Sequence, residues 1–182
     1  MSAAQLAIGL SFTETRRVFA ALAFAAQRHR DAPRPSADPC LAHPIAVAET
    51  IVSIGGVTDA VVLCAALLHD VINNTETPPQ LLIDRFGREI ADVVLDISDD
   101  MSLPEPQRRR VQIAYAPNLS GRARLVRLAD MLCRLQRLAA LPRAQREAET
   151  AFVAQMVGGL SGMNAALEAA ADKALLALHD KP

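Results

Sequence analysis

Residues 61–72, VVLCAALLHDVI, decide how this chain folds. Eight consecutive apolar residues lead into the doublet His69–Asp70, and their lack of alternation is typical of a segment buried on all sides. Burying an imidazole and a carboxylate together is costly unless something compensates them. A divalent metal ion is one such compensator, so the stretch predicts a metal site inside the protein and makes hydrolysis a candidate activity.

The composition of the whole chain predicts a helical fold. The 182 residues are 51% hydrophobic, with abundant Ala and Leu, but only 3% are aromatic. This balance favours packed helices over a β-sandwich, which is richer in Val, Thr and Tyr. The chain is long enough to form one domain with a substantial core. We therefore expect residues 1–182 to form a single all-α domain, a bundle of about eight to ten helices.

Charge, hydropathy and cysteine usage exclude several classes of protein. A formal net charge of −1 argues against a general nucleic-acid binder. No apolar stretch reaches the roughly 20 residues that a membrane helix needs, and residues 1–17 lack the basic start of a signal peptide. Cys40, Cys64 and Cys133 are odd in number and widely spaced, which favours reduced thiols. We expect a cytoplasmic protein that binds neither nucleic acid nor a membrane.

Periodicity and punctuation locate the helices. Apolar residues recur at helical spacing, and residues such as Gly87 and Pro142 separate the segments. Thr58 or Asp59 is expected to cap the buried helix that runs to about residue 72. No strand pattern is convincing. The expected helices cover approximately residues 11–28, 44–54, 59–72, 79–86, 88–98, 107–114, 122–139, 144–158 and 162–179.

Two further positions extend the His69–Asp70 doublet into a candidate metal site. His43 stands before Pro44 at the start of a predicted helix, and Asp130 is an acid within an apolar helical stripe. Two imidazoles and two carboxylates suit manganese, iron or zinc better than calcium. Taken singly, a buried His is more often a hydrogen-bonded core residue, and a helical Asp is more often a cap or an ion-pair partner. Their joint order along the chain favours the metal site.

An asparagine pair follows the doublet. Residues four apart share one face of a helix, so Asn73 is expected one turn beyond His69 and Asn74 one turn beyond Asp70. The two amides would then border any metal ion that the doublet holds.

The motifs taken in order resemble the HD-domain hydrolases of the RelA/SpoT group, and among them the single-domain small alarmone hydrolases, which include a metazoan SpoT homologue. The matching stretches are PCLAHP (39–44), AALLHD (65–70), DDMSLP (99–104), LVRLAD (125–130) and GGLSGMN (158–164). The resemblance implies an HD domain that removes the 3′-pyrophosphate from (p)ppGpp, giving GDP or GTP and pyrophosphate. It also implies one metal ion, usually Mn²⁺, with four ligands. These ligands would be His43, His69, Asp70 and Asp130.

The chain departs from this family directly after the doublet. Where the family carries a Glu-Asp pair that positions and activates the attacking water, this chain has Asn73 and Asn74. An amide can hydrogen-bond a water but cannot accept its proton, and the loss of a general base commonly costs about 10²–10⁴-fold in rate. Water activated by a metal ion retains some reactivity near neutral pH. We therefore expect Asn73 and Asn74 in the catalytic position, with weakened hydrolysis.

The predicted nucleotide pocket departs from the family as well. After the Leu-Ala-Asp motif the family continues toward a basic residue and then a His-Asn or Tyr-Asn pair, and here those places hold Met131, Cys133 and Arg134. The resemblance makes the last position a substrate contact, so Arg134 would bring a charge to it. Arg34 best matches the basic residue that the family places beside the guanine, and Cys40 replaces an aromatic residue.

An arginine-rich region adds candidate phosphate contacts. Residues 101–150 hold ten arginines against four acidic residues, a local balance of +6. Arginine forks bind phosphate well, but most of these side chains are expected on solvated helix faces, because the chain uses only two lysines and favours Arg throughout. Arg110, Arg127 and Arg134 are the best candidates for substrate contact.

Three functions fit the sequence. The first is a manganese-dependent (p)ppGpp 3′-pyrophosphohydrolase. The second is a homologue that binds a nucleotide in a regulatory role without turning it over, and the third is a hydrolase of another nucleotide, such as an adenine alarmone or NADPH. A homo-oligomer is compatible with each of them. An apolar C-terminal stripe is expected to be core or subunit interface, and it consists of Met156, Leu160, Met163 and Leu167.

Overall fold

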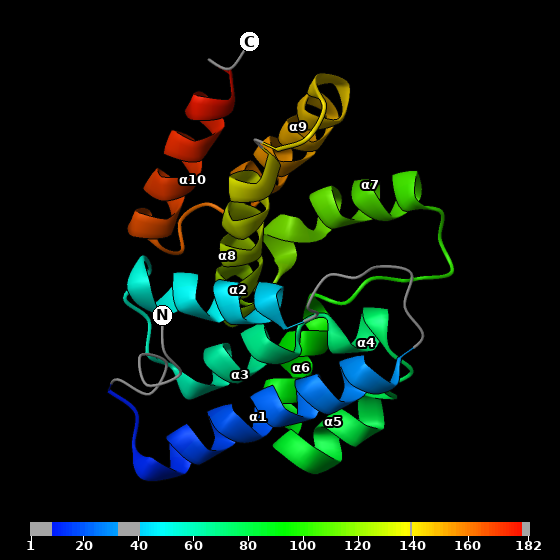
Figure 1. Ribbon diagram of the computed structural model, residues 1–182, viewed down its shortest axis with the longest axis vertical. Coiled ribbons are helices and arrows are strands. Elements are labelled where there is room, and N and C mark those ends of the chain that lie inside the picture. Colours follow the sequence, from blue (N-terminus) through cyan, green and yellow to red (C-terminus); the bar gives the residue numbers. More distant parts are fainter. Residues whose placement is uncertain (1–8, 33–40, 139, 180–182) are drawn as a thin grey trace.

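The computed structural model describes residues 9–32, 41–138 and 140–179, and every regular element within them is a helix (Figure 1). The all-α prediction is therefore confirmed. Among these helices, none combines the length and the hydrophobicity that crossing a bilayer requires. The elements are α1 (Phe12–Asp31), α2 (Ala42–Ser53), α3 (Ala60–Leu68), α4 (Val71–Asn74), α5 (Pro79–Phe86), α6 (Arg88–Asp96), α7 (Glu105–Tyr115), the short 3₁₀ helix η2 (Ala116–Asn118), α8 (Gly121–Leu138), α9 (Arg143–Gly159) and α10 (Ala165–His179).

Helix α3 forms the centre of the core. All nine of its residues are buried, and it packs against α1, α2, α6 and α8. Figure 1 shows it lying between α1 and α2. Each fully buried Leu or Val side chain stabilises a fold by about 1.5–3 kcal/mol relative to an exposed one. Because α3 is apolar on every side, only its ends can carry polar chemistry, and its carboxyl end leads into His69.

The amino end of α3 begins at a side-chain cap. Of the two predicted caps, Asp59 is the one used: its Oδ1 accepts hydrogen bonds from the backbone N–H groups of Val61 (2.8 Å) and Val62 (3.3 Å). Its Oδ2 accepts a hydrogen bond from Nε of Arg122 at 2.8 Å. The cap therefore also fixes the start of α3 to α8.

The predicted helix over residues 59–72 is divided in the structure, so its continuity was predicted wrongly. The helix α3 ends before the doublet, His69 and Asp70 form a turn, and a separate short helix, α4, follows. The ring of His69 lies 2.8 Å from the carbonyl of Ala66, which the next turn of a continuous helix would use. Both turn residues keep right-handed helical backbone angles. The one-turn spacing of the asparagine pair from the doublet therefore survives the break.

The joint between α5 and α6 depends on Gly87. Its φ of +83° lies in the left-handed region, which a residue with a Cβ adopts only with strain. Its N–H bonds to the carbonyl of Ile83 at 2.9 Å and ends α5, and α6 starts at the next residue. This sharp turn lets α6 pack against both α5 and α3. The chain then leaves α6 in the loop that carries Ser98 and Asp99.

The C-terminal stripe is core. Met156, Leu160 and Leu167 are almost completely buried, and Met163 is half-buried. Met156 lies on α9 and Leu167 on α10, and these two helices pack against α8 and against each other. Of the two roles expected for this stripe, the structure therefore supports packing within the chain.

We predict that Asp59→Ala destabilises the protein by about 1–2 kcal/mol, because losing a carboxylate helix cap commonly costs this much. The variant also removes the acceptor of Arg122. Thermal unfolding should show a midpoint lower by a few degrees. The control is Asp92→Ala, which removes a carboxylate from an exposed position on α6. Equal midpoints for the two variants would contradict the importance of the cap.

Candidate metal centre

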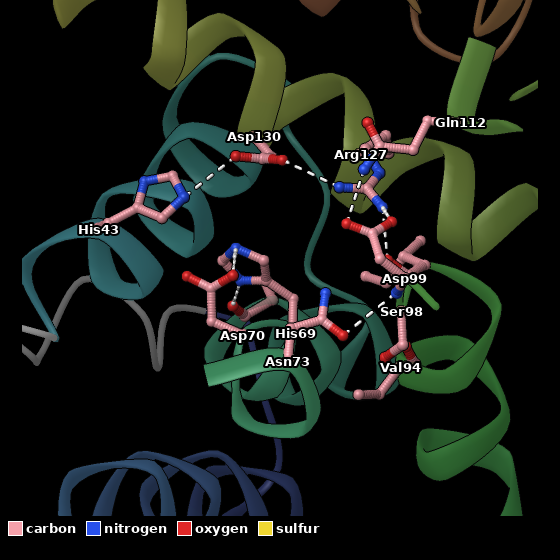
Figure 2. Close-up of polar contacts among 12 residues, drawn as sticks. His43, His69, Asp70, Asn73, Val94, Ser98, Asp99, Gln112, Arg127 and Asp130 are labelled. Carbon is pink, nitrogen blue, oxygen red and sulfur yellow. Dashed lines mark hydrogen bonds and ion pairs between the residues drawn. The ribbon is translucent and has the colours of Figure 1, made fainter. Parts of the chain in front are cut away.

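Three helices bring a cluster of possible metal ligands together. His43 lies in the first turn of α2, His69 follows the end of α3, and Asp130 lies within α8. One ligand atom from each of the three residues lies within 4.8 Å of the other two. The two imidazole rings stand nearly perpendicular, with centroids 5.1 Å apart. Figure 2 shows the three side chains pointing into one space between α2, α8 and the end of α3.

The buried ring of His69 is oriented as a metal ligand requires. Its Nδ1 lies 2.8 Å from the carbonyl oxygen of Ala66, which can only accept a hydrogen bond, so Nδ1 carries the proton and Nε2 keeps its lone pair. This lone pair faces Oδ1 of Asp70 at 3.3 Å. Two acceptors at that distance repel each other unless a cation or a proton lies between them. The pair therefore fits a divalent ion, and Asp70 extends the cluster to four residues.

Asp130 is an ionised carboxylate in a buried position. Its Oδ1 lies 3.0 Å from Nε2 of His43, and its Oδ2 accepts a hydrogen bond from Nη1 of Arg127 at 3.4 Å. Burial alone would raise the pKa of Asp130, but the hydrogen bond with His43 and the positive charges of His69, when its ring is protonated, and of Arg127 hold that pKa well below its usual range. A carboxylate that stays charged without exposure to water is a suitable ligand for a cation.

His43 is held differently from His69. Its Nδ1 lies 3.1 Å from Nη2 of Arg137, and because a guanidinium only donates, Nδ1 must accept this bond. The proton is then on Nε2, where it is donated to Asp130. For Nε2 to bind a metal ion, the proton must move to Nδ1, and the bond from Arg137 must break. Arg137 therefore competes with the metal-binding form of this ring.

The two predicted catalytic asparagines border the same pocket but differ in their contacts. Asn73 is half-buried, and its Oδ1 accepts a hydrogen bond from the backbone N–H of Asp99 at 3.1 Å. Asn74 is exposed. The pocket has a volume of about 280 Å³, and charged groups from α2, α7, α8 and the loop after α6 surround it. Its lining residues include His43, Asp70, Asn73, Asn74, Asp99, Arg108, Gln112, Arg127, Asp130, Arg134 and Arg137.

The structure separates the predicted substrate-binding arginines. Arg127 and Arg134 line the pocket, but both are already bonded: Arg127 to Asp130 and the carbonyl of Ile97, and Arg134 to Glu149, with Nε donating at 2.9 Å. Arg110 is exposed on α7 and lies outside the lining of the pocket. Arg34 lies outside the described residues, as does Cys40.

Four polar residues without a role predicted from the sequence also line the pocket: Asp99, Arg108, Gln112 and Arg137. Helical spacing could have found three of them. Arg108 and Gln112 are four apart on α7, and Arg137 shares a face of α8 with Arg134 and Asp130. Asp99 lies in one of the stretches that resemble the family, but only the fold shows that this loop packs beside Asn73.

A helical domain that gathers two histidines and two carboxylates from separate helices is typical of a metal-dependent phosphohydrolase. The family model described as HD domain matches residues 21–157, so the chain belongs to the HD-domain family. Membership in a family of such hydrolases implies a divalent metal ion, and the cluster around His43, His69 and Asp130 is the group that could hold it.

Similar proteins are found among curated sequences and among solved structures. The chain is 42% identical over 155 residues to guanosine-3′,5′-bis(diphosphate) 3′-pyrophosphohydrolase MESH1 of Danio rerio. The aligned region covers 82% of this chain and 84% of that protein. The Homo sapiens protein of the same name is 38% identical over 165 residues, covering 87% and 92%. A solved metazoan ortholog of SpoT that hydrolyzes ppGpp and plays a role in starvation responses has a TM-score of 0.80 at 33% identity, covering 88% of this chain and 94% of that one. These relatives confirm the family resemblance seen in the sequence.

We predict that Arg137→Met increases the affinity for Mn²⁺ by about two- to tenfold, because the net value of a hydrogen bond is about 0.5–1.5 kcal/mol. The substitution removes the donor that keeps the proton of His43 on Nε2, the nitrogen that a metal ion would bind. It also takes a positive charge away from the site. Isothermal titration calorimetry without nucleotide measures the change. Arg143→Met is the matched control, since that exposed arginine pairs with Glu147 on α9. Weaker binding in the Arg137 variant would show that the guanidinium supports the site.

Proposed function

We propose that this protein is a metal-dependent hydrolase that removes the 3′-pyrophosphate from (p)ppGpp. The observation that carries the proposal is the facing pair His69 Nε2 and Asp70 Oδ1 beside His43 and Asp130, because that arrangement suits a cation. The relatives at 38–42% identity bear the name of this reaction and support the choice of substrate. The proposal treats residues 1–182 as one HD-type domain.

The side chains of the cluster would hold one divalent ion, and we propose Mn²⁺. Such an ion supplies a Lewis acid that makes water more acidic and offsets phosphate charge. Water attacks the phosphorus next to the 3′ oxygen of the ribose, the bond between that phosphorus and the 3′ oxygen breaks, and the products are pyrophosphate and GDP or GTP. The proposed ligands are His43, His69, Asp70 and Asp130.

The arginines and amides around the cluster would bind and orient the substrate. Arg108, Arg134 and Arg137 are half-buried or exposed at the rim of the pocket, where guanidinium groups can bind phosphate oxygens. Asn73 and Asn74 would hold the attacking water by hydrogen bonds but cannot accept its proton. Hydrolysis is therefore proposed to be slower than with carboxylates in these two positions. The cytoplasmic location and the oligomeric state stay predictions from the sequence.

We predict that the purified protein with Mn²⁺ releases pyrophosphate from ppGpp and that Asp130→Asn lowers the rate at least 100-fold, since the substitution removes a charged ligand. Anion-exchange chromatography of the nucleotides measures both rates. Asp92→Asn, on the exposed face of α6, is the control and should keep the wild-type rate.

The same assay separates the other two candidate functions. Binding of ppGpp without release of pyrophosphate under any divalent metal would show a binding protein in place of an enzyme. Faster hydrolysis of NADPH or of an adenine alarmone than of ppGpp would keep the enzyme and change its substrate.

A further inference from the structure

The proposed reaction needs a group that takes a proton from the attacking water, and the asparagine pair cannot supply it. Three carboxylates line the pocket in the described part of the chain: Asp70, Asp99 and Asp130. Two of them belong to the metal cluster, where their lone pairs face imidazole nitrogens. Asp99 is the remaining one, and nothing in the metal cluster uses it.

Asp99 is held in a defined position by three neighbours. Its backbone N–H donates to Oδ1 of Asn73 at 3.1 Å, and its Oδ2 accepts a hydrogen bond from Nε2 of Gln112 at 2.6 Å. Its Oδ1 lies 3.8 Å from Nη2 of Arg127, which is beyond hydrogen-bonding distance. One oxygen of the carboxylate is therefore fixed by Gln112, while the other keeps acceptor capacity on the pocket side.

Arg127 sets the distance between Asp99 and the metal cluster. Its Nη1 donates to Oδ2 of Asp130 while its Nη2 faces Asp99, so one guanidinium lies between the two carboxylates. Figure 2 shows Asp99 and Asp130 on either side of Arg127, with Asn73 below them. Only the guanidinium of Arg127 thus separates the carboxylate of Asp99 from Asp130, a proposed metal ligand.

Other groups near the pocket are unsuited to accept the proton. Arg127 stays protonated at any pH that a protein tolerates. Glu149 is bonded to Arg109 and Arg134. The neighbouring Asp100 is exposed and accepts hydrogen bonds from the backbone and the hydroxyl of Ser102.

We propose that Asp99 is the proton acceptor of the hydrolysis and that Asn73 positions it; this inference rests on the proposed function. The carboxylate of Asp99 takes one proton from the attacking water as the oxygen of that water forms its bond to phosphorus. The bond from phosphorus to the 3′ oxygen breaks, and its electron pair stays on that oxygen. The proton held by Asp99 then passes, directly or through solvent, to the 3′ oxygen. Asn73 contributes by fixing the backbone of Asp99, a task that an amide oxygen performs as well as a carboxylate.

The test compares Asp99→Asn in two backgrounds. In the wild-type chain we expect kcat for ppGpp to fall at least 100-fold with KM changed less than threefold, because the asparagine keeps the shape but loses the proton acceptor. In the Asn73→Glu/Asn74→Asp background the same substitution should cost less than about fivefold, since the restored carboxylates can take the proton. Asp99→Glu should keep more activity than Asp99→Asn, and Asp100→Asn is the matched control with unchanged kcat.

Two measurements without turnover separate catalysis from structure. Calorimetry should give the same Mn²⁺ affinity for Asp99→Asn as for the wild type, and the unfolding midpoint should change by less than that of Asp59→Ala. An equal loss of kcat in both backgrounds would show that Asp99 acts only by holding Arg127, and would overturn the inference. Wild-type activity that survives Asp99→Asn would overturn it too, while leaving the proposed function intact. If the wild-type protein does not hydrolyse ppGpp, both the proposed function and the inference about Asp99 are wrong. If activity appears only in the Asn73→Glu/Asn74→Asp variant, Asp99 does not replace the missing carboxylate pair.

Discussion

The hydrogen bond between Nδ1 of His69 and the carbonyl of Ala66 is the contact on which the site depends. All nine residues of α3 are buried, and this bond holds the ring of His69 just beyond the end of that helix. It also directs Nε2 away from the helix. A continuous helix would use the same carbonyl for the N–H of Asp70, but the chain turns at the doublet. The imidazole is thus oriented at the same turn that brings Asp70 and Asn73 to the pocket.

Charge pairing determines how the rest of the pocket is arranged. The carboxylate of Asp130 and the carbonyl of Ile97 hold Arg127, and Glu149 holds Arg134 and Arg109 over the ring of Phe152. Such partners keep long side chains ordered and reduce the conformational entropy that binding would otherwise cost. These partners also compete with the substrate, because a phosphate group must displace a bound carboxylate to reach the guanidinium groups.

The sequence predicted the helices well, and it named three residues that the fold gathers into one cluster, because both depend on local pattern. An unbroken apolar run defines α3, and the residues His43, His69 and Asp130 are recognisable by their neighbours in the chain. The division at the doublet was missed because apolar residues lie on both sides of it, so periodicity gives no sign of the turn. Asp99 was missed for another reason: its contact with Asn73 joins residues 26 positions apart, so only packing reveals it. Helical spacing relates Arg137 to Asp130 and Arg134, but its contact with His43, 94 positions away, follows from packing alone.

The candidate ligands lie on α2, in the turn that follows α3, and on α8, and this links metal supply to the integrity of the fold. Helices α2 and α3 follow one another, but α8 comes much later in the chain, and the cluster exists only when all three are docked. An ion that binds the folded chain alone adds a free energy that grows with its concentration, about 2.7 kcal/mol at one hundred times its dissociation constant. Local stability of this region would then follow the supply of divalent metal in the cell, and a chelator would act on the packing of α2 and α8 as well as on chemistry.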